Sequence, residues 1–468
     1  MAQAHASEID QVRGSELVQM YKNRLRRADW LQAIAWFSGV VAVALYLAGG
    51  GASDFTSWRD IPVGLGVIAG LLGSDLVLVM LLLAARLPVI DRAVGYDRAM
   101  NAHRRLGKPA LYLLLAHFAF VLVGYGIALN VNPFEMAVIM ITSMTDMPLA
   151  FVSLGLFLLV VITSLVIVRH RLKYQFWFLV HLISYVAVLL SIPHQFSQGH
   201  LFAEGTWARW YWALLYGGAL GSVVLFRFVV PLALNIRHRL RVLDVIVEAP
   251  GVVSIVVQGR SLDKMLVAGG QFFIWRFGQR GLRWEGHPYS LSDTPDGHTL
   301  RITVRELGDS SRRLQGIRPG ARVWAEGPYG LFTPAARTRQ DAVLIGGGIG
   351  ITPIFSLLAD MVHVARKITV IVRADDDQHL YLRAQFERVC AAGHVELIEI
   401  VGPPQRDGHT WLPESARGTV TSLATLVPNI AECDVYVCGP QRWADFVIGD
   451  ARHAGVNSSA IHSERFAW

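Results

Sequence analysis

Residues 174–196 read YQFWFLVHLISYVAVLLSIPHQF, and this stretch decides how the first half of the chain is interpreted. It carries no charged residue, and a helix of about 20 apolar residues is long enough to cross a bilayer. Two histidines, His181 and His194, lie within it. A polar side chain inside a membrane is costly and is usually functional. The segment therefore predicts a membrane-spanning helix whose two imidazoles bind something.

The whole chain is unusually apolar, but unevenly so. Hydrophobic residues make up 53% of its 468 positions, and the mean hydropathy is +0.39. That is too high for one soluble protein of this length. Nearly all the long apolar runs lie in residues 30–235, whereas residues 236–468 have the composition of a soluble protein. We therefore expect a membrane domain followed by soluble domains. The three cysteines all lie in the soluble half, for which a reduced, cytoplasmic location fits. No two of them form a CxxC motif, so the sequence does not suggest a zinc site.

Six segments are long and apolar enough to span a bilayer. They are, approximately, residues 30–49, 62–85, 104–129, 148–168, 174–196 and 210–234. Arginines and lysines gather at one set of segment ends, and the opposite loops hold only Arg59 and Arg209. The positive-inside rule then predicts that both termini and the soluble domains are cytoplasmic. The net charge of +7 follows from this topology, and we expect no nucleic-acid partner.

Four histidines lie on two of the predicted spans. His103 and His117 are on the third span, and His181 and His194 are on the fifth. Their spacings of 14 and 13 residues rise by about 21 Å and about 19.5 Å along a helix. Because both spans run in the same direction, each of two depths offers two imidazoles, as bis-imidazole ligation of a haem iron requires. Thirteen residues turn the helix face by about 140°, so we expect Pro193 to change the phase.

The histidine pattern has a simpler alternative, in which each imidazole only bridges neighbouring helices by hydrogen bonding. Four histidines at matched depths favour haem instead. A metal-ion site is disfavoured because no Asp, Glu or Cys accompanies the imidazoles at either depth.

Two further charged residues lie well inside the predicted spans, away from the charged ends. Asp75 is in the middle of the second span, where it either hydrogen-bonds to a neighbouring helix or belongs to a proton path. Arg227 lies in the inner part of the sixth span. We expect it to pair with a haem propionate, the alternative being that it extends to the membrane surface.

The soluble half changes from one strand pattern to another. Residues 238–330 contain short alternating strands separated by Gly and Pro, which predict a small antiparallel barrel. After residue 340 an apolar strand, the turn GGGIGITP (346–353) and a helix follow, with later strands at KITVIVRADD and AECDVYVCGP. This order is typical of an α/β nucleotide domain, in which glycines let backbone N–H groups approach a pyrophosphate.

Six short motifs follow one another in the soluble half. They are HPYSLSD (287–293), GDSSRRL (308–314), EGPYG (326–330), GGGIGITP (346–353), VCGP (437–440) and SERF (463–466). Their order resembles that of the ferredoxin–NADP reductase superfamily. Together with the histidines, residues 30–468 resemble the ferric reductase and NADPH oxidase superfamily of transmembrane haem flavoproteins, of the bacterial type. The resemblance implies FAD, two haem b groups and NADPH as cofactors, with NADH as the alternative.

The expected fold is an all-α six-helix membrane domain, an FAD-binding antiparallel β-barrel and an α/β nucleotide-binding domain. The expected divisions are a cytoplasmic N-terminal segment (1–29), a six-span haem domain (30–236), the FAD-binding barrel (237–336) and the NAD(P)H-binding domain (337–468). His103 and His181 would hold the inner haem, and His117 and His194 the outer one.

The resemblance also implies roles for residues in the FAD motifs. His287, Tyr289 and Ser290 match the motif that holds FAD, with Ser290 near the flavin N5 and Tyr289 against the ring. Arg305 and Ser311 match positions that contact the FAD diphosphate, where a guanidinium and a small hydroxyl suit anionic oxygens.

Other matching positions belong to the nicotinamide cofactor. The pyrophosphate turn and the nicotinamide end would be formed by Gly348, Gly350, Thr352, Pro353, Cys438, Gly439 and Pro440. Phe466 matches the aromatic residue that covers the flavin, a role for which Trp468 is an alternative, and Ser290, Cys438 and Phe466 would act at hydride transfer. Arg373 suits a 2′-phosphate, although the acidic run 375–377 follows it at once.

The predicted function is a transmembrane oxidoreductase in a bacterial cell membrane, passing electrons from cytoplasmic NAD(P)H through FAD and two haems to an outer acceptor. A ferric chelate is favoured, because no Lys or Arg occurs from Ala110 to Val168 and a fixed cation would stabilise superoxide. The nearest candidate cations are His200 and Arg209. The alternatives are an oxidase that makes superoxide, an electron-transfer subunit for a periplasmic protein or quinone, and a channel or scaffold with a degenerate reductase fold. Protein partners stay open.

Overall fold

The computed structural model describes residues 2–169, 171–172, 174–198, 205–283, 285–391, 394–405, 410–416 and 422–465. The chain divides into two compact units. We call Arg27–Ile90 with Tyr96–Phe228 the helical unit, and Met1–Arg26, Asp91–Gly95 and Val229–Trp468 the sheet unit. Each unit is described by itself.

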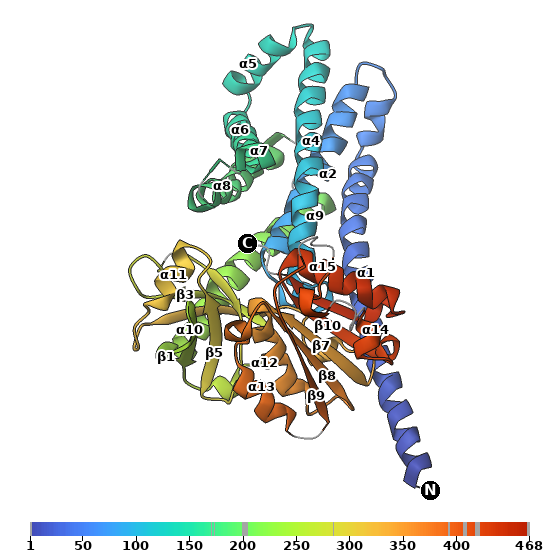
Figure 1. The fold of residues 1–468 in the computed structure, drawn as a ribbon. Helices are drawn as coiled ribbons and strands as arrows, with labels where there is room; N and C mark the ends of the chain where they lie inside the picture. The colour runs from blue at the N-terminus through green and yellow to red at the C-terminus, as the bar shows by residue number, and fades with distance from the viewer. Residues whose placement is uncertain are drawn as a thin grey trace. The chain divides into compact units, whose positions relative to one another are not determined.

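The described residues contain six helical segments that are long and apolar enough to cross a membrane, which confirms the predicted number of spans. They lie in α1 (Ala2–Ala48), α2 (Ile61–Ala84), α4 (Tyr96–Leu129), α6 (Met147–Ser164), α8 (Tyr174–Gln198), and α9 (Trp207–Val224) with the π-helical turn η3 (Leu225–Val229) and α10 (Val230–His238) (Figure 1). The expected lead-in helix and the first span form one helix, and Arg227 lies in η3.

Shorter helices connect the spans. They are η1 (Gly51–Phe55), α3 (Pro88–Ala93), α5 (Pro133–Ser143) and α7 (Val166–Arg169). The helix α5 occupies a segment that the sequence had indicated as a loop. Asn132 begins it, because its side chain accepts from Phe134 N and Glu135 N at 3.0 Å, while Glu135 accepts from Asn132 N at 3.4 Å. This reciprocal pair is a capping box, and Pro133 suits the first helical position.

The helices α2 and α4 pack closely because small residues line their contact. A Cβ atom at Gly124 of α4 would lie 2.5 Å from Val63 Cγ2 and 2.9 Å from the Val63 nitrogen. Small residues let membrane helices approach until their backbones meet. This close approach brings backbone carbonyls of α2 within reach of side chains on α4.

The first part of the sheet unit is the expected antiparallel barrel. Its strands are β1 (Arg241–Ala249), β2 (Val252–Gln258), β3 (Phe272–Phe277), β4 (His287–Ser290), β5 (Thr299–Arg305) and β6 (Val323–Tyr329). They form two three-stranded sheets, ordered β1-β2-β5 and β4-β3-β6. Single bridges, Arg241 with Arg322 and Leu291 with Ile302, join the two sheets at both seams. Trp275 and Phe273 are fully buried in the barrel core.

The second part of the sheet unit is a parallel α/β domain, as predicted. Its strands are β7 (Asp341–Gly347), β8 (Ile368–Ala374), β9 (Val395–Val401), β10 (Cys433–Gly439) and β11 (Ile461–Arg465), in the order β11-β10-β7-β8-β9. The helices α12 (Ile351–Met361) and α13 (Arg383–Cys390) share one hydrophobic core, and α14 (Leu423–Leu426) and α15 (Gln441–His453) share another (Figure 1). The sequence prediction had not identified β4, β9 or β11.

Short helical turns complete the sheet unit. They are α11 (Asp309–Gln315), η4 (Leu262–Lys264), η5 (Pro334–Ala336), η6 (Gly348–Gly350), η7 (Asp377–His379), η8 (Glu414–Ala416), η9 (Ile430–Glu432) and η10 (Ser458–Ala460).

Candidate cofactor sites

The inner histidine pair consists of His103 on α4 and His181 on α8. Their ring centroids are 6.0 Å apart and their planes cross at 69°. Two metal–imidazole bonds of about 2 Å, placed end to end, set two ring centroids roughly 6 Å apart. The structure therefore brings together the two inner histidines that the sequence paired, at a separation that fits one metal atom between them.

Neighbouring groups orient both inner rings. His103 Nδ1 lies 3.0 Å from the Met80 carbonyl oxygen. Because a carbonyl only accepts, Nδ1 carries the proton and Nε2 keeps a lone pair for a metal. The His181 ring stacks on Trp177 with centroids 5.1 Å apart. The Arg169 guanidinium lies over the same Trp177 ring, 4.5 Å from its centroid. His181 Nδ1 is buried without a hydrogen-bond partner among the described residues.

The outer pair consists of His117 on α4 and His194 on α8. His117 Nδ1 donates to the Gly66 carbonyl oxygen at 2.8 Å. Gly70 makes room for this ring, because a Cβ there would lie 2.5 Å from His117 Nδ1. His194 interacts electrostatically with His117 and Asp146, and its Nδ1 is buried without a partner among the described residues.

The inner pair, with its ring separation of 6.0 Å, suits a metal group held by two imidazoles. Among the described residues, no group of three or more His, Cys, Asp or Glu side chains is placed to hold a metal ion. The chemistry of the inner residues fits the haem that the sequence implies there, with His103 and His181 as the expected ligands, and His117 and His194 stay the predicted ligands of the outer one.

The strand β4 and the segment just after it carry buried polar atoms that lack hydrogen-bond partners among the described residues. They are His287 Nε2, Ser290 Oγ, Ser292 Oγ and Thr294 Oγ1. Buried polar groups are nearly always hydrogen-bonded, so these orphaned atoms need an explanation. A bound ring system with several acceptors and donors, such as a flavin, would satisfy them.

The same strand offers an uncharged surface to a ring. The His287 and Tyr289 rings stack with centroids 6.3 Å apart. Burial lowers the pKa of His287, although Glu285 opposes this shift, and the imidazole is neutral at neutral pH. Burial raises the pKa of Tyr289 to about 12. Trp275 Nε1 donates to the Tyr289 carbonyl at 3.0 Å, which fixes β4 against β3.

One of the two expected diphosphate contacts lies beside the glycine-rich turn. Arg305 ends β5, and its Nη1 is 4.0 Å from the position of a Cβ on Gly348, whose φ is +55°. The guanidinium and the turn therefore lie close enough to contact the same anionic group. Ser311 is engaged differently. Its hydroxyl accepts from Leu307 N and Gly308 N at 2.8 and 2.9 Å, so it caps α11.

The glycine-rich turn meets the end of β10. A Cβ at Gly350 would lie 2.3 Å from the Cys438 carbonyl oxygen, so only glycine fits there. Thr352 Oγ1 donates to the Ile349 carbonyl at 2.9 Å at the start of α12. Two of the cofactor-binding motifs predicted for NAD(P)H, GGGIGITP and VCGP, thus lie in direct contact, and Pro353, Gly439 and Pro440 lie in these same two segments.

Cys438 is fully buried, and in the parallel register of β10 and β11 it lies opposite Glu464. Burial, and then Glu464, raises the pKa of the Cys438 thiol well above its ordinary value. The thiol is therefore protonated at neutral pH. Glu464 Oε2 also lies 3.8 Å from the Cβ position of Gly330 in the EGPYG motif. The C-terminal strand thus reaches the barrel, and Phe466 and Trp468, like His200, lie outside the described residues.

Arg373 at the end of β8 is 5% exposed. Its Nη1 lies 3.5 Å from Asp375 Oδ1 and also contacts the Ala374 carbonyl, and its Nε has no partner among the described residues. Burial lowers the pKa of this guanidinium. Asp375 therefore holds the side chain that the sequence indicated for a 2′-phosphate.

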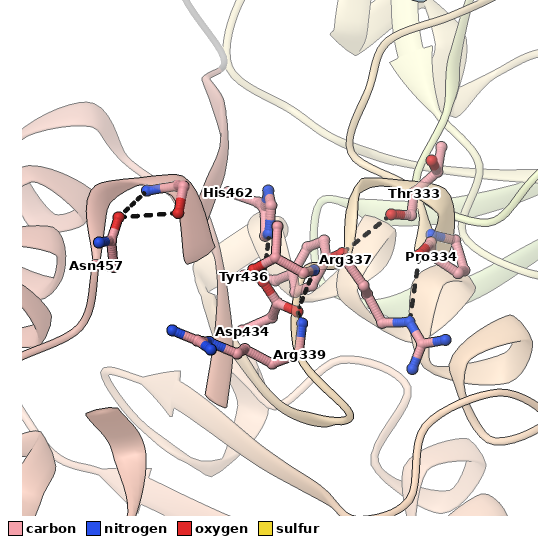
Figure 2. Close-up of polar contacts among 10 residues, drawn as sticks. Thr333, Pro334, Arg337, Arg339, Asp434, Tyr436, Asn457 and His462 are labelled. Atoms are coloured by element: carbon pink, nitrogen blue, oxygen red, sulfur yellow. Dashed lines mark hydrogen bonds and ion pairs between the residues drawn. The ribbon is translucent and has the colours of Figure 1, made fainter. Parts of the chain in front are cut away.

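A buried carboxylate fixes the strand that leads to the C-terminus. Asp434 of β10 accepts from Thr338 N at 2.7 Å, from Arg339 N at 2.6 Å and from His462 Nε2 of β11 at 2.9 Å. Figure 2 shows its side chain between His462 and the backbone at Arg339. The Tyr436 and His462 rings lie 4.4 Å apart beside it. This cluster joins β10, β11 and the segment before β7.

Comparisons with known proteins match the two halves of the chain separately. Residues 69–192 match the family model described as "Ferric reductase like transmembrane component", and residues 344–448 match "Oxidoreductase NAD-binding domain". The chain joins a ferric reductase-like transmembrane component to an oxidoreductase NAD-binding domain. It is thus an integral membrane protein related to NAD(P)H-dependent flavin reductases, and the expected superfamily resemblance is confirmed.

Individual relatives match in parts. The chain is 31% identical over 185 residues to a carnitine monooxygenase reductase subunit of Escherichia coli (strain K12), covering 38% of this chain and 53% of the relative. It is 24% identical over 310 residues to dual oxidase 1 of Canis lupus familiaris, covering 58% of this chain and 18% of the relative. The FAD/NAD-binding domain of nitric oxide dioxygenase from Vibrio cholerae O1 biovar El Tor covers 49% of this chain and 99% of that one, at 22% identity and a TM-score of 0.40. The chain spans about half the length of the curated relatives it matches first.

Several positioning residues were not found from the sequence. Met80 and Gly66 act through backbone carbonyls, which leave no side-chain signal. Trp177 lies four residues before His181, a spacing that places both on one helix face. Asp434 precedes the VCGP motif within an apolar strand, where a lone acidic residue was the available signal.

Replacing Asp434 with Ala should destabilise the sheet unit. The change leaves two backbone N–H groups without their acceptor, and the free energy of unfolding should fall by about 2–4 kcal/mol. Thermal unfolding of the full chain in detergent measures the effect. The exposed Asp309, whose ion pair with Arg312 spans 3.7 Å, is the control, because Asp309→Ala should cost about 0.5 kcal/mol or less. Equal Tm values for the two variants would contradict this role of Asp434.

Proposed function

We propose that the chain is a transmembrane oxidoreductase that passes electrons from cytoplasmic NAD(P)H to an acceptor at the outer membrane face, with both termini in the cytoplasm. The observation that carries the proposal is the inner histidine pair, whose 6.0 Å ring separation leaves space for one metal atom. When bound, the flavin would take a hydride and release single electrons, and the haems would carry these electrons through the apolar interior.

The chain's own residues hold and orient the cofactors. The carbonyls of Met80 and Gly66 keep Nδ1 of His103 and His117 protonated, so that Nε2 of each would have a lone pair for a haem iron. In the sheet unit, His287, Tyr289 and Ser290 would line the flavin site, with Arg305 toward the diphosphate. The turn Gly348–Gly350 and the neutral Cys438 would bound the nicotinamide cofactor.

A ferric chelate is the favoured acceptor. Among the described residues, one acidic and one basic side chain lie close to His194 or its neighbour Phe196. Asp146 interacts with His194, and Arg209 lies 5.7 Å from the ring of Phe196. No Lys or Arg occurs from Ala110 to Val168. Such a sparsely charged exit supports outer-sphere electron transfer to a small acceptor with little selectivity.

Reduction of oxygen to superoxide is the second candidate. The similarity to dual oxidase 1 extends over 310 residues. Arg209, which lies 5.7 Å from the ring of Phe196, two residues after His194, is a cation that would stabilise the superoxide anion. The two candidates differ in whether turnover needs oxygen.

Anaerobic turnover separates the two acceptors. We expect NAD(P)H oxidation by vesicles of known orientation to continue without oxygen when a membrane-impermeant ferric chelate is supplied on the outer side. Ferrous product and NAD(P)H loss are followed together by absorbance. If turnover stops completely under these conditions, the ferric reductase proposal is wrong and the oxidase proposal replaces it.

Replacing His181 with Ala should remove the inner haem. The haem content should fall by about half, because each haem needs both imidazoles of its pair, and outward electron flow should stop. Haem absorbance per chain and acceptor reduction are the measurements, with the exposed His363→Ala as control. A His181→Ala protein that keeps full haem content and activity would overturn the ligand assignment.

Arg373 should set the preference between NADPH and NADH. A 2′-phosphate offers the guanidinium a stronger partner than Asp375 does, so Arg373→Ala should lower the ratio of kcat/KM for NADPH to that for NADH by about tenfold. Arg383→Ala, which removes an exposed ion pair with Glu399, should leave the ratio unchanged. An unchanged ratio in Arg373→Ala would show that Arg373 does not discriminate.

A further inference from the structure

Asp75 connects three helices of the helical unit through two hydroxyl groups. Asp75 Oδ1, on α2, lies 2.5 Å from Ser38 Oγ on α1. Ser38 Oγ lies 2.9 Å from the hydroxyl of Tyr211 on α9. The Tyr211 hydroxyl in turn lies 2.7 Å from the Ser38 carbonyl oxygen. The three contacts form one unbroken chain that starts at a carboxyl and ends at a carbonyl.

The carboxyl has no charged partner to stabilise it as an anion. Asp75 is 3% exposed, in the middle of a membrane-spanning helix. Among the described residues, no Arg, Lys or His lies within ion-pair distance of it. Tyr211 on α9 is its titratable neighbour, and α1 contributes the neutral Ser38. An isolated carboxylate at this depth would be expensive.

Counting protons gives the charge state of the carboxyl. Ser38 and Tyr211 each carry one hydroxyl proton, but the chain has three contacts that need a proton. With an ionised Asp75, Ser38 donates to the carboxylate and Tyr211 donates to the Ser38 carbonyl, so that the contact between the two hydroxyl oxygens is left without a proton of its own. With a protonated Asp75, the acid donates to Ser38 Oγ, Ser38 donates to Tyr211, and Tyr211 donates to the Ser38 carbonyl. Every contact is then a hydrogen bond.

We propose that Asp75 is an intramembrane proton-binding site, which holds one proton as a neutral carboxylic acid at the head of the Asp75–Ser38–Tyr211 chain. The proposal stands on geometry within the helical unit and does not depend on the acceptor or on the proposed electron transfer.

The place of this site along α2 gives it a consequence. Asp75 lies between Gly66 and Met80, whose carbonyls accept from the outer and inner histidines. The carboxyl is therefore at a depth between the two histidine pairs. A fixed negative charge there would act strongly on any charge crossing the apolar interior. The bound proton removes this negative charge.

Infrared spectroscopy of the purified full chain tests the proton directly. A carboxylic acid has a carbonyl stretch that is well separated from the bands of a carboxylate. The wild type at neutral pH should show a carboxylic acid band that Asp75→Asn removes. Tyr211→Phe should keep this band but shift it, because Ser38 loses one acceptor and bonds differently to the acid.

Asp54 provides a matched control in the same unit. Its carboxyl accepts one hydrogen bond from the Tyr46 hydroxyl. The tyrosine supplies the one proton that this contact needs, so the carboxyl does not have to be protonated. Asp54→Asn should therefore remove no carboxylic acid band. If Asp75→Asn does not fold, Tyr211→Phe decides alone. A Tyr211→Phe protein whose carboxylic acid band is identical to that of the wild type would overturn the proposal. A folded Asp75→Asn protein that keeps the wild-type band would overturn it as well.

Discussion

A buried imidazole in a membrane needs hydrogen-bond partners, and the helical unit supplies one to each of the two histidines on α4. The helix α2 supplies the first partners, since its carbonyls at Met80 and Gly66 accept from His103 and His117. The opposite nitrogens then keep lone pairs that suit a metal. Because a carbonyl must come within hydrogen-bond distance of an imidazole, α2 has to lie directly against α4. The small residue Gly124 makes that approach sterically allowed.

In the sheet unit, uncharged and charged groups lie in separate parts of the predicted cofactor site. Burial keeps His287, Tyr289 and Cys438 uncharged, which suits flat aromatic rings. The cation Arg305 lies instead at the glycine-rich turn, where anionic oxygens would bind. The strand β10 ties the parts together, because Asp434 near its beginning fixes β11, while its end meets the turn.

Much of this arrangement could be predicted from the sequence, because its signals are periodic or local. Apolar length gave the six spans, alternation gave the barrel, and the glycine-rich turn gave the nucleotide domain. The misses have physical reasons as well. The helix α5 begins at a capping box inside a segment too short to suggest a domain, and β4 is a four-residue strand within a motif. The burial of Arg373 and the capping role of Ser311 depend on neighbours that a sequence motif does not specify.

The central claim is that two pairs of imidazoles hold two haems at two depths of one membrane domain. Electron paramagnetic resonance of the purified, oxidised wild-type chain, combined with haem quantification per chain, tests it most directly. The account predicts two low-spin haems per chain, each with two imidazole ligands. A single haem per chain, or a high-spin signal from a haem with an open coordination position, would contradict it.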